Sequence, residues 1–164
     1  MMKELIEKFK EIYEYASWES REQNSVPTPK KPFALCMSNI SAYKRTGRNF
    51  VLGGNDAGHY TLVDDLVDVA DETKKFRVTV TPHYSPRSAS EGMLLRLVAS
   101  TPFVRMGKGN VSGTDICFCD KPENPRILIF LIEVTVVSVR LLSNTCATED
   151  LYKLVSVVAS QIRK

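Results

Sequence analysis

The side chains that could carry chemistry in this chain are densest in one basic segment, residues 43–50, with the sequence YKRTGRNF. Three cations, Lys44, Arg45 and Arg48, fall within five residues, and an aromatic residue stands at each end. Cations contact phosphate groups, and aromatic rings can stack on unpaired bases. The segment therefore indicates a surface for RNA, single-stranded DNA or another polyanion, with a solvated loop as the plainer alternative.

Basic residues elsewhere could extend this surface if the fold brings them together. The whole chain carries a net charge of only +3, so attraction of a polyanion has to come from a local patch. Two basic stretches, 21–60 and 76–126, flank an acidic one, 61–75. The predicted binding residues are Tyr43, Lys44, Arg45, Arg48, Phe50, Arg77, Arg87, Arg105 and Lys108.

The cysteines do not predict a metal site. Cys117 and Cys119 would share one face of a strand, but zinc needs about four ligands, and no second pair stands at a finger-like spacing. Four cysteines in 164 residues are also too few for a disulfide framework. We interpret all four, including Cys36 and Cys146, as reduced core thiols in a reducing compartment.

Two further motifs fall short of known binding loops. The glycine-rich loop 107–114 misses the dinucleotide-binding spacing by one residue and leads into a strand, so it is interpreted as a turn. The four aspartates within 64–71 lack the spacing of a calcium loop. We interpret them as the polar face of a short helix over 61–72, and no cofactor is predicted.

Catalytic residues are equally sparse. His59 and His83 are the two histidines, and neither has a carboxylate or a nucleophile at a motif spacing. We therefore predict no catalytic residue. An enzyme with a site near His83, Ser85 and Arg87 is the least favoured of three alternatives.

The elements that position these residues follow from hydrophobic spacing. Residues 1–18 alternate apolar and charged groups at helical steps. Residues 19–32 hold three prolines and are interpreted as a linker. A strand-rich core over 33–142 follows, and then a second amphipathic helix over 148–163 with Thr148 as its cap.

The most apolar segment runs from Ile127 to Leu142, and half of its sixteen residues are β-branched. Such residues favour a strand. The run is shorter than the ~20 residues of a membrane span, and it contains Glu133 and Arg140. We predict one long strand with both faces apolar over 127–132. The domain's own helices would cover one face, and a further layer of this chain or a second subunit would cover the other.

Shorter elements complete the predicted core. A hairpin with its turn at 46–49 is expected within 43–52, a loop over 85–92, and a segment over 93–100 that fits either a helix or a strand. The remaining predicted strands are 33–40, 76–81, 103–106 and 116–119.

The sequence thus predicts a single α+β domain over residues 1–164, with a mostly antiparallel sheet of five to seven strands flanked by N- and C-terminal amphipathic helices. The favoured function is a non-enzymatic, intracellular binding or assembly protein, homo-oligomeric, whose partner is nucleic acid or another polyanion. The alternative is a self-assembling structural protein, matrix-like or scaffold, that uses the basic patch on anionic membrane or nucleoprotein. Neither a transmembrane segment nor a signal peptide is predicted.

Overall fold

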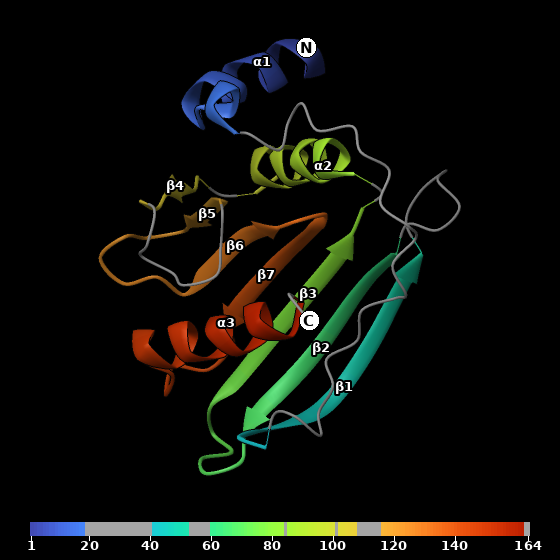
Figure 1. The fold of residues 1–164 in the computed structure, drawn as a ribbon. Coiled ribbons are helices and arrows are strands. Elements are labelled where there is room, and N and C mark those ends of the chain that lie inside the picture. Colours follow the sequence, from blue (N-terminus) through green and yellow to red (C-terminus); the bar gives the residue numbers. More distant parts are fainter. Residues whose placement is uncertain (19–40, 53–59, 84, 101, 108–115, 163–164) are drawn as a thin grey trace.

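The computed structural model describes residues 1–18, 41–52, 60–83, 85–100, 102–107 and 116–162. Over these residues the chain forms one antiparallel sheet in the order β1-β2-β3-β7-β6-β5-β4, with helices on both of its faces (Figure 1). The predicted α+β class is confirmed. The elements are α1 Met2–Ile12, the 3-10 helix η1 Tyr15–Ser17, β1 Tyr43–Leu52, β2 Tyr60–Asp68, β3 Lys75–Pro82, α2 Pro86–Val98, β4 Val104–Arg105, β5 Ile116–Cys119, β6 Ile127–Ile132, β7 Thr135–Leu141 and α3 Thr148–Ile162.

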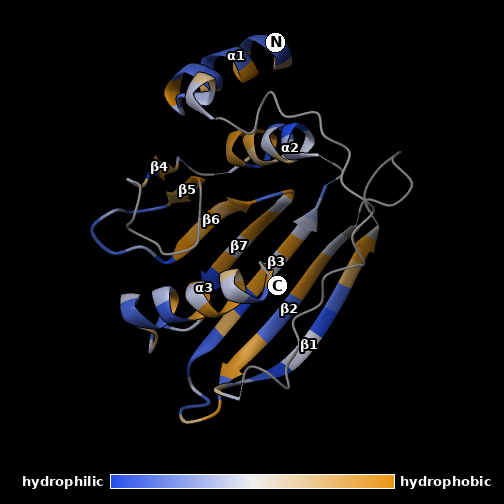
Figure 2. Ribbon diagram, in the orientation of Figure 1, coloured by the Kyte–Doolittle hydropathy of each residue, from blue (hydrophilic) through white to orange (hydrophobic). Residues whose placement is uncertain are grey.

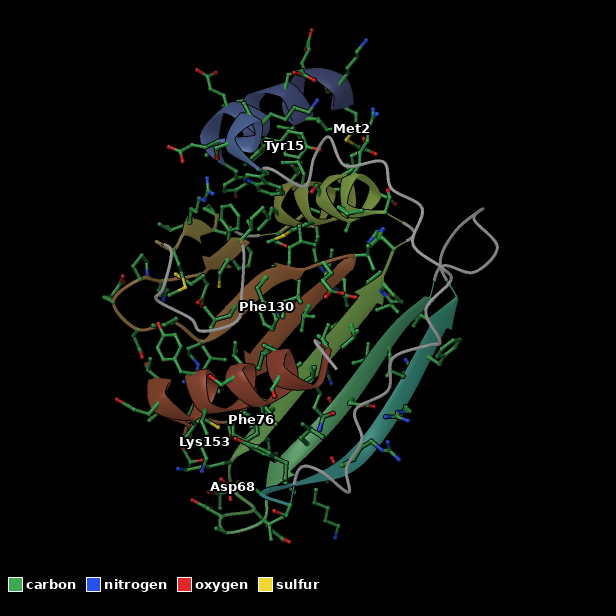
Figure 3. The ribbon with its side chains drawn as sticks, viewed as in Figure 1. Met2, Tyr15, Asp68, Phe76, Phe130 and Lys153 are labelled. Atoms are coloured by element: carbon green, nitrogen blue, oxygen red, sulfur yellow. The ribbon has the colours of Figure 1, made fainter. Side chains whose placement is uncertain are left out.

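Each face of the sheet has its own core. α3 packs on one face, where Phe76 and Phe130 lie between the sheet and the helix (Figure 3). α2 packs on the other face, and α1 lies over α2 as an outer layer (Figure 1). The hydropathy colouring shows apolar residues along β6, between these layers (Figure 2). We call the two faces of the sheet the α3 face and the α2 face.

The predicted single strand over 127–142 is wrong, because it is a hairpin of β6 and β7. The chain reverses at Glu133 and Val134, so that Ile132 pairs with Thr135. Glu133 has a φ of 52°, as two-residue hairpin turns require. Leu128 and Phe130 face α3, whereas Ile129 and Leu131, which alternate with them, face α2. The chain's own helices therefore bury both faces of β6, and this strand no longer argues for a second subunit.

The predicted helix over 61–72 is also wrong, because residues 60–68 form strand β2 between β1 and β3. The apolar positions of this segment fit the period of a helix as well as that of a strand. The segment forms a strand because it pairs with both β1 and β3. The predicted turn at 46–49 lies inside one continuous strand, β1. Its register against β2 shifts between Arg45 and Gly47, so the polar residues mark a β-bulge and not a hairpin end.

The predicted loop over 85–92 is the beginning of α2. The Ser85 hydroxyl accepts a hydrogen bond from the Ser88 amide at 3.0 Å, and Pro86 follows at the first helical position. Both features are typical of helix N-termini. The strand over 76–81, with Phe76, Val78 and Val80 inward, is confirmed as part of β3, as are the short strands β4 and β5.

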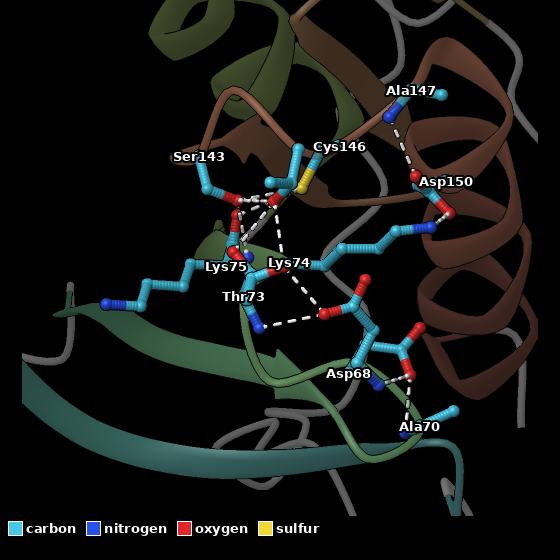
Figure 4. Close-up of polar contacts among 11 residues, drawn as sticks. Asp68, Ala70, Thr73, Lys74, Lys75, Ser143, Cys146, Ala147 and Asp150 are labelled. Atoms are coloured by element: carbon cyan, nitrogen blue, oxygen red, sulfur yellow. Dashed lines mark hydrogen bonds and ion pairs between the residues drawn. The ribbon is translucent and has the colours of Figure 1, made fainter.

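The C-terminal helix is confirmed, although its first turn is held by Asp150 and not by Thr148. The Asp150 carboxylate accepts hydrogen bonds from the Ala147 amide at 2.7 Å and from Lys74 Nζ at 3.1 Å. The contact with Lys74 ties the helix to the turn between β2 and β3 (Figure 4). The predicted linker 19–32 and strand 33–40 lie outside the described residues, as does the glycine-rich loop beyond Gly107.

Candidate anion-binding site

A cavity of about 360 Å³ lies on the α2 face of the sheet. Its lining combines three arginines, three hydroxyl side chains and three apolar side chains. These are Arg77, Arg96, Arg140, Thr79, Ser100, Ser138, Phe103, Ile127 and Ile129.

The floor of the cavity consists of two neighbouring rows across the sheet. In one row Arg77 of β3 stands opposite Arg140 of β7, and Arg140 stands opposite Ile127 of β6. In the next row Thr79 stands opposite Ser138. Successive side chains of a strand point to opposite faces, so the residues alternating with these belong to the α3 core. The strand register therefore gathers the polar side chains on one face.

The wall of the cavity comes from the C-terminal end of α2 and the segment after it. Met93, Leu94 and Leu97 of this helix are buried, which fixes the helix against the sheet and brings Arg96 of its last turn to the cavity. The Ser100 hydroxyl donates to the Arg96 carbonyl oxygen at 2.7 Å. The partial negative charge of a helix C-terminus favours the Arg96 cation without supplying a full balancing charge.

The cavity carries more positive than negative charge. Arg77 donates to both carboxylate oxygens of Asp65, from Nε at 2.8 Å and from Nη2 at 3.2 Å, and this contact raises the pKa of Arg77. Burial, and then the charge of Arg140, lowers the pKa of Arg96. Within the described residues no carboxylate pairs with Arg96 or Arg140. Three guanidinium groups thus face one carboxylate, and such an excess suits an anionic ligand.

The cavity continues a line of cations on the same face. The register places Lys44 of β1 and Lys75 of β3 on either side of Val67 of β2, one row away from Arg77 and Arg140. The side chain of Lys75 extends away from the contacts of Asp150 (Figure 4). In the part of the chain that the structure describes, neither lysine has a carboxylate partner. We call Lys44, Lys75, Arg77, Arg140 and Arg96 the basic track.

The predicted binding residues therefore divide between two faces. Lys44 and Arg77 belong to the basic track, whereas Arg45, Arg48 and Phe50 lie on the α3 face. Phe50 is 50 % exposed there.

Tyr43, also on the α3 face, is closed to a stacking base. It is 5 % exposed and packs edge-on against Phe76, with the ring centroids 5.6 Å apart. Burial raises the pKa of Tyr43 to about 12.

Three of the predicted cations are held in ion pairs away from the cavity. Arg48 donates to both oxygens of Asp64, at 2.7 and 2.9 Å, and Asp64 is only 1 % exposed. Arg87 pairs with Glu91 at 3.1 Å, and Arg105 pairs with Glu14 at 3.2 Å. Lys108 lies outside the described residues. Of the aspartates interpreted as a helix face, Asp64 and Asp65 are thus the partners of two strand arginines, Arg48 and Arg77.

Arg96, Arg140 and Lys75 are the residues that the sequence prediction missed. The signal for Arg140 was present, because Ser138 and Arg140 alternate with Val137, Val139 and Leu141 and so mark a polar stripe on β7. For Arg96 no local signal existed, since its position depends on how α2 lies across the sheet.

The structure also places the histidine and cysteine side chains that were considered for catalysis and metal binding. His83 Nδ1 lies 3.2 Å from the Ser88 hydroxyl, and its ring packs so closely on Gly92 that a Cβ atom there would clash with His83 Cε1. Cys117 and Cys119 are free and buried in the α3 core, and burial raises the pKa of Cys117 to about 12. Among the described residues no group of His, Cys, Asp and Glu side chains could hold a metal ion.

The comparisons with known proteins add no assignment. No protein-family model matches this sequence, and neither a curated protein nor a solved structure matches it. Of the helices that the structure describes, none is long and apolar enough to cross a membrane.

Proposed function

We propose that this protein binds single-stranded nucleic acid through the basic track, as a non-enzymatic binding protein. The observation that carries the proposal is the arrangement of four cations on the α2 face of the sheet, with Arg96 of α2 as a fifth at the arginine-lined cavity. Four of these five, Lys44, Lys75, Arg96 and Arg140, have no carboxylate partner among the described residues. Cations of this kind supply most contacts to phosphate groups.

The shape of the track favours a single strand over a duplex. Arg96 is partly buried, and the cavity lies between α2 and the sheet. A stiff double helix could reach the exposed Lys44 and Lys75 but could not lower its phosphates to Arg96. A flexible strand can follow the sheet surface and turn into the cavity, as single strands do on other sheet-based binding surfaces.

The chemistry of the track favours phosphate over carboxylate. Guanidinium forks bind phosphate oxygens in pairs, and lysine ammonium groups act as point charges for phosphate. An acidic peptide would offer one carboxylate per side chain, each on a flexible stem whose ordering costs entropy. A single strand of nucleic acid, by contrast, presents its phosphate groups at a regular spacing along one backbone.

The test is the salt dependence of binding to a fluorescent single-stranded oligonucleotide, measured by anisotropy. Replacing Lys44 and Lys75 together by Gln should weaken binding and flatten the plot of log affinity against log salt by about 0.7 for each phosphate group that the variant no longer binds. Arg45→Gln is the matched control, because Arg45 is an exposed cation of the same strand on the opposite face. Equal weakening in the control and the double variant would contradict the proposal. Binding of polyglutamate as tight as that of the oligonucleotide would also contradict it.

A further inference from the structure

The cavity differs from the rest of the basic track in both charge and shape, and this difference bears on which part of a strand it receives. We infer that the cavity is an end site, which holds a terminal phosphate monoester and not an internal phosphodiester. The inference rests on the proposed function for the attached strand, but the recognition of the phosphate itself depends only on the residues that line the cavity.

The charge of the cavity matches a monoester better than a diester. Arg77, Arg96 and Arg140 bring three positive charges to the cavity, and Asp65 brings one negative charge through its contact with Arg77. Among the described residues the surplus is therefore two positive charges. A phosphate monoester carries about −1.5 to −2 at pH 7, which matches this surplus, whereas an internal phosphodiester carries a single negative charge and would leave one cation unbalanced.

Apolar side chains interrupt the cations of the basic track beyond Arg140. Beyond Arg140 the next side chain in its row is Ile127, and beyond Ser138 the next is Ile129. Phe103 lines the cavity as well. A nucleic-acid strand that entered along Lys75 and Arg77 would thus meet apolar side chains past Arg140 and Ser138. Among the described residues the next cation in these rows is Arg105, which lies beyond Ile129 and Phe118 and is already paired with Glu14. The last phosphate of the strand belongs at the arginines.

The cavity also offers many hydrogen-bond donors. Arg96 and Arg140 can each donate two parallel hydrogen bonds to a pair of phosphate oxygens, and Arg77 keeps N–H groups beside the two that contact Asp65. The hydroxyl groups of Thr79 and Ser138 also line the cavity, and within the described residues neither has a partner. A monoester has three terminal oxygens to accept such bonds, and an internal diester has two. Hydrogen-bond donors from β3, β7 and α2 therefore suit the monoester, which has more oxygens to accept them.

The size of the cavity agrees with this assignment. Its volume of about 360 Å³ lies at the low end of the range of roughly 300–1,000 Å³ for small-molecule sites. A terminal phosphate and its adjoining sugar would be held there, while the rest of the strand would continue over the exposed sheet surface towards Lys75 and Lys44.

The experiment compares oligonucleotides of one sequence and length that carry a 5′-phosphate, a 3′-phosphate or only hydroxyl ends. One phosphorylated form should bind about tenfold or more tightly than the hydroxyl form, the effect of about one added charge-assisted contact. Arg96→Gln and Arg140→Gln should each abolish this preference, and Arg45→Gln should retain it. Arg140→Lys, which keeps the charge and removes the fork, should reduce the preference in part. Melting curves of each variant verify that it is folded.

Inorganic phosphate separates the two proposals. It should raise the melting temperature of the wild type at constant ionic strength and abolish the preference for the phosphorylated strand, without displacing the hydroxyl-ended strand. Equal affinity for all three oligonucleotides would overturn the end site and leave the proposed function standing. Stabilisation by phosphate that depends on Arg96 and Arg140, without binding of any oligonucleotide, would overturn the proposed function and leave a site for free phosphate.

Discussion

Arg77 and Arg140 stand directly opposite each other on β3 and β7, and both belong to the α2 face of the sheet. The Cβ atoms of such a pair are about 5 Å apart, and like charges placed in this way destabilise a sheet. Asp65 offsets the charge of Arg77 at 2.8 Å, whereas Arg140 has no carboxylate partner among the described residues. The fold thus carries a repulsion that a bound anion would relieve.

The first prediction follows from this repulsion. Arg140→Gln should stabilise the protein in phosphate-free buffer by about 0.2–1 kcal/mol, the range for cross-strand pairs. The wild type should gain stability when phosphate is added, by about 2.7 kcal/mol at a hundredfold excess over the dissociation constant, and the variant should gain much less. Urea unfolding at constant ionic strength measures both quantities. A variant that is less stable than the wild type without phosphate would show that Arg140 is a structural residue.

The second prediction concerns the two arginine–aspartate pairs of β2. Arg48→Ala should destabilise the protein by about 3–5 kcal/mol, because it leaves the carboxylate of Asp64 uncompensated in the interior. Arg77→Ala is the matched control, since it also breaks a pair with two hydrogen bonds, but the side chain of Asp65 is 37 % exposed. Its effect should stay below about 1 kcal/mol. Equal effects in chemical denaturation would mean that water reaches Asp64.

Asp64 and Asp65 also illustrate which parts of the fold could be predicted from the sequence and which could not. The inward face of β3 and the apolar stripe of α3 were predicted correctly, because both patterns repeat within a few residues. Strand β2 was missed because its acidic residues resemble a polar helix face. Only the partners Arg48 and Arg77, which lie 16 and 12 residues away in the chain, make carboxylates acceptable in a central strand.

The candidate site was harder to predict because its residues also come together only through contacts between distant parts of the sequence. The turn that separates β6 from β7 contains Glu133 and Val134 and no glycine or asparagine, so the apolar run gave no sign of a reversal. Without that reversal Arg140 has no defined neighbour. The cavity exists because strand pairing places Arg140 beside Arg77 and because α2 crosses above them. Neither relationship is contained in local spacing.

The third prediction concerns pH and the first turn of α3. Burial alone would raise the pKa of Asp150, but hydrogen bonds from the Ala147 amide and Lys74 outweigh it and lower the pKa. A carboxyl group whose pKa is lowered on folding stabilises the protein above its unfolded pKa of about 3.9, and this stabilisation disappears as the pH falls through the lower, folded value. Asp150→Asn should therefore cost about 0.5–2 kcal/mol at pH 7, the range for helix caps, and much less in strong acid.

The control for this prediction is Glu149→Gln, which removes one negative charge from the same turn at an exposed position. Urea midpoints between pH 2 and pH 7 should converge for Asp150→Asn and the wild type as the pH falls. The midpoints of the control should stay near those of the wild type throughout. A constant gap between Asp150→Asn and the wild type down to pH 2 would mean that the Asp150 side chain acts through packing and not through charge.

The fourth prediction tests whether α3 closes the core of the single chain. Leu154 is 0 % exposed and lies in the same cluster as Phe76 and Phe130. Leu154→Ala should leave a cavity and lower the free energy of unfolding by about 2–5 kcal/mol, while Ser156→Ala on the exposed side of the helix should change it by less than about 0.5 kcal/mol. Because the helix packs on the chain's own sheet, the destabilisation should not depend on protein concentration. A destabilisation that grows on dilution would instead show that α3 is stabilised by a second subunit.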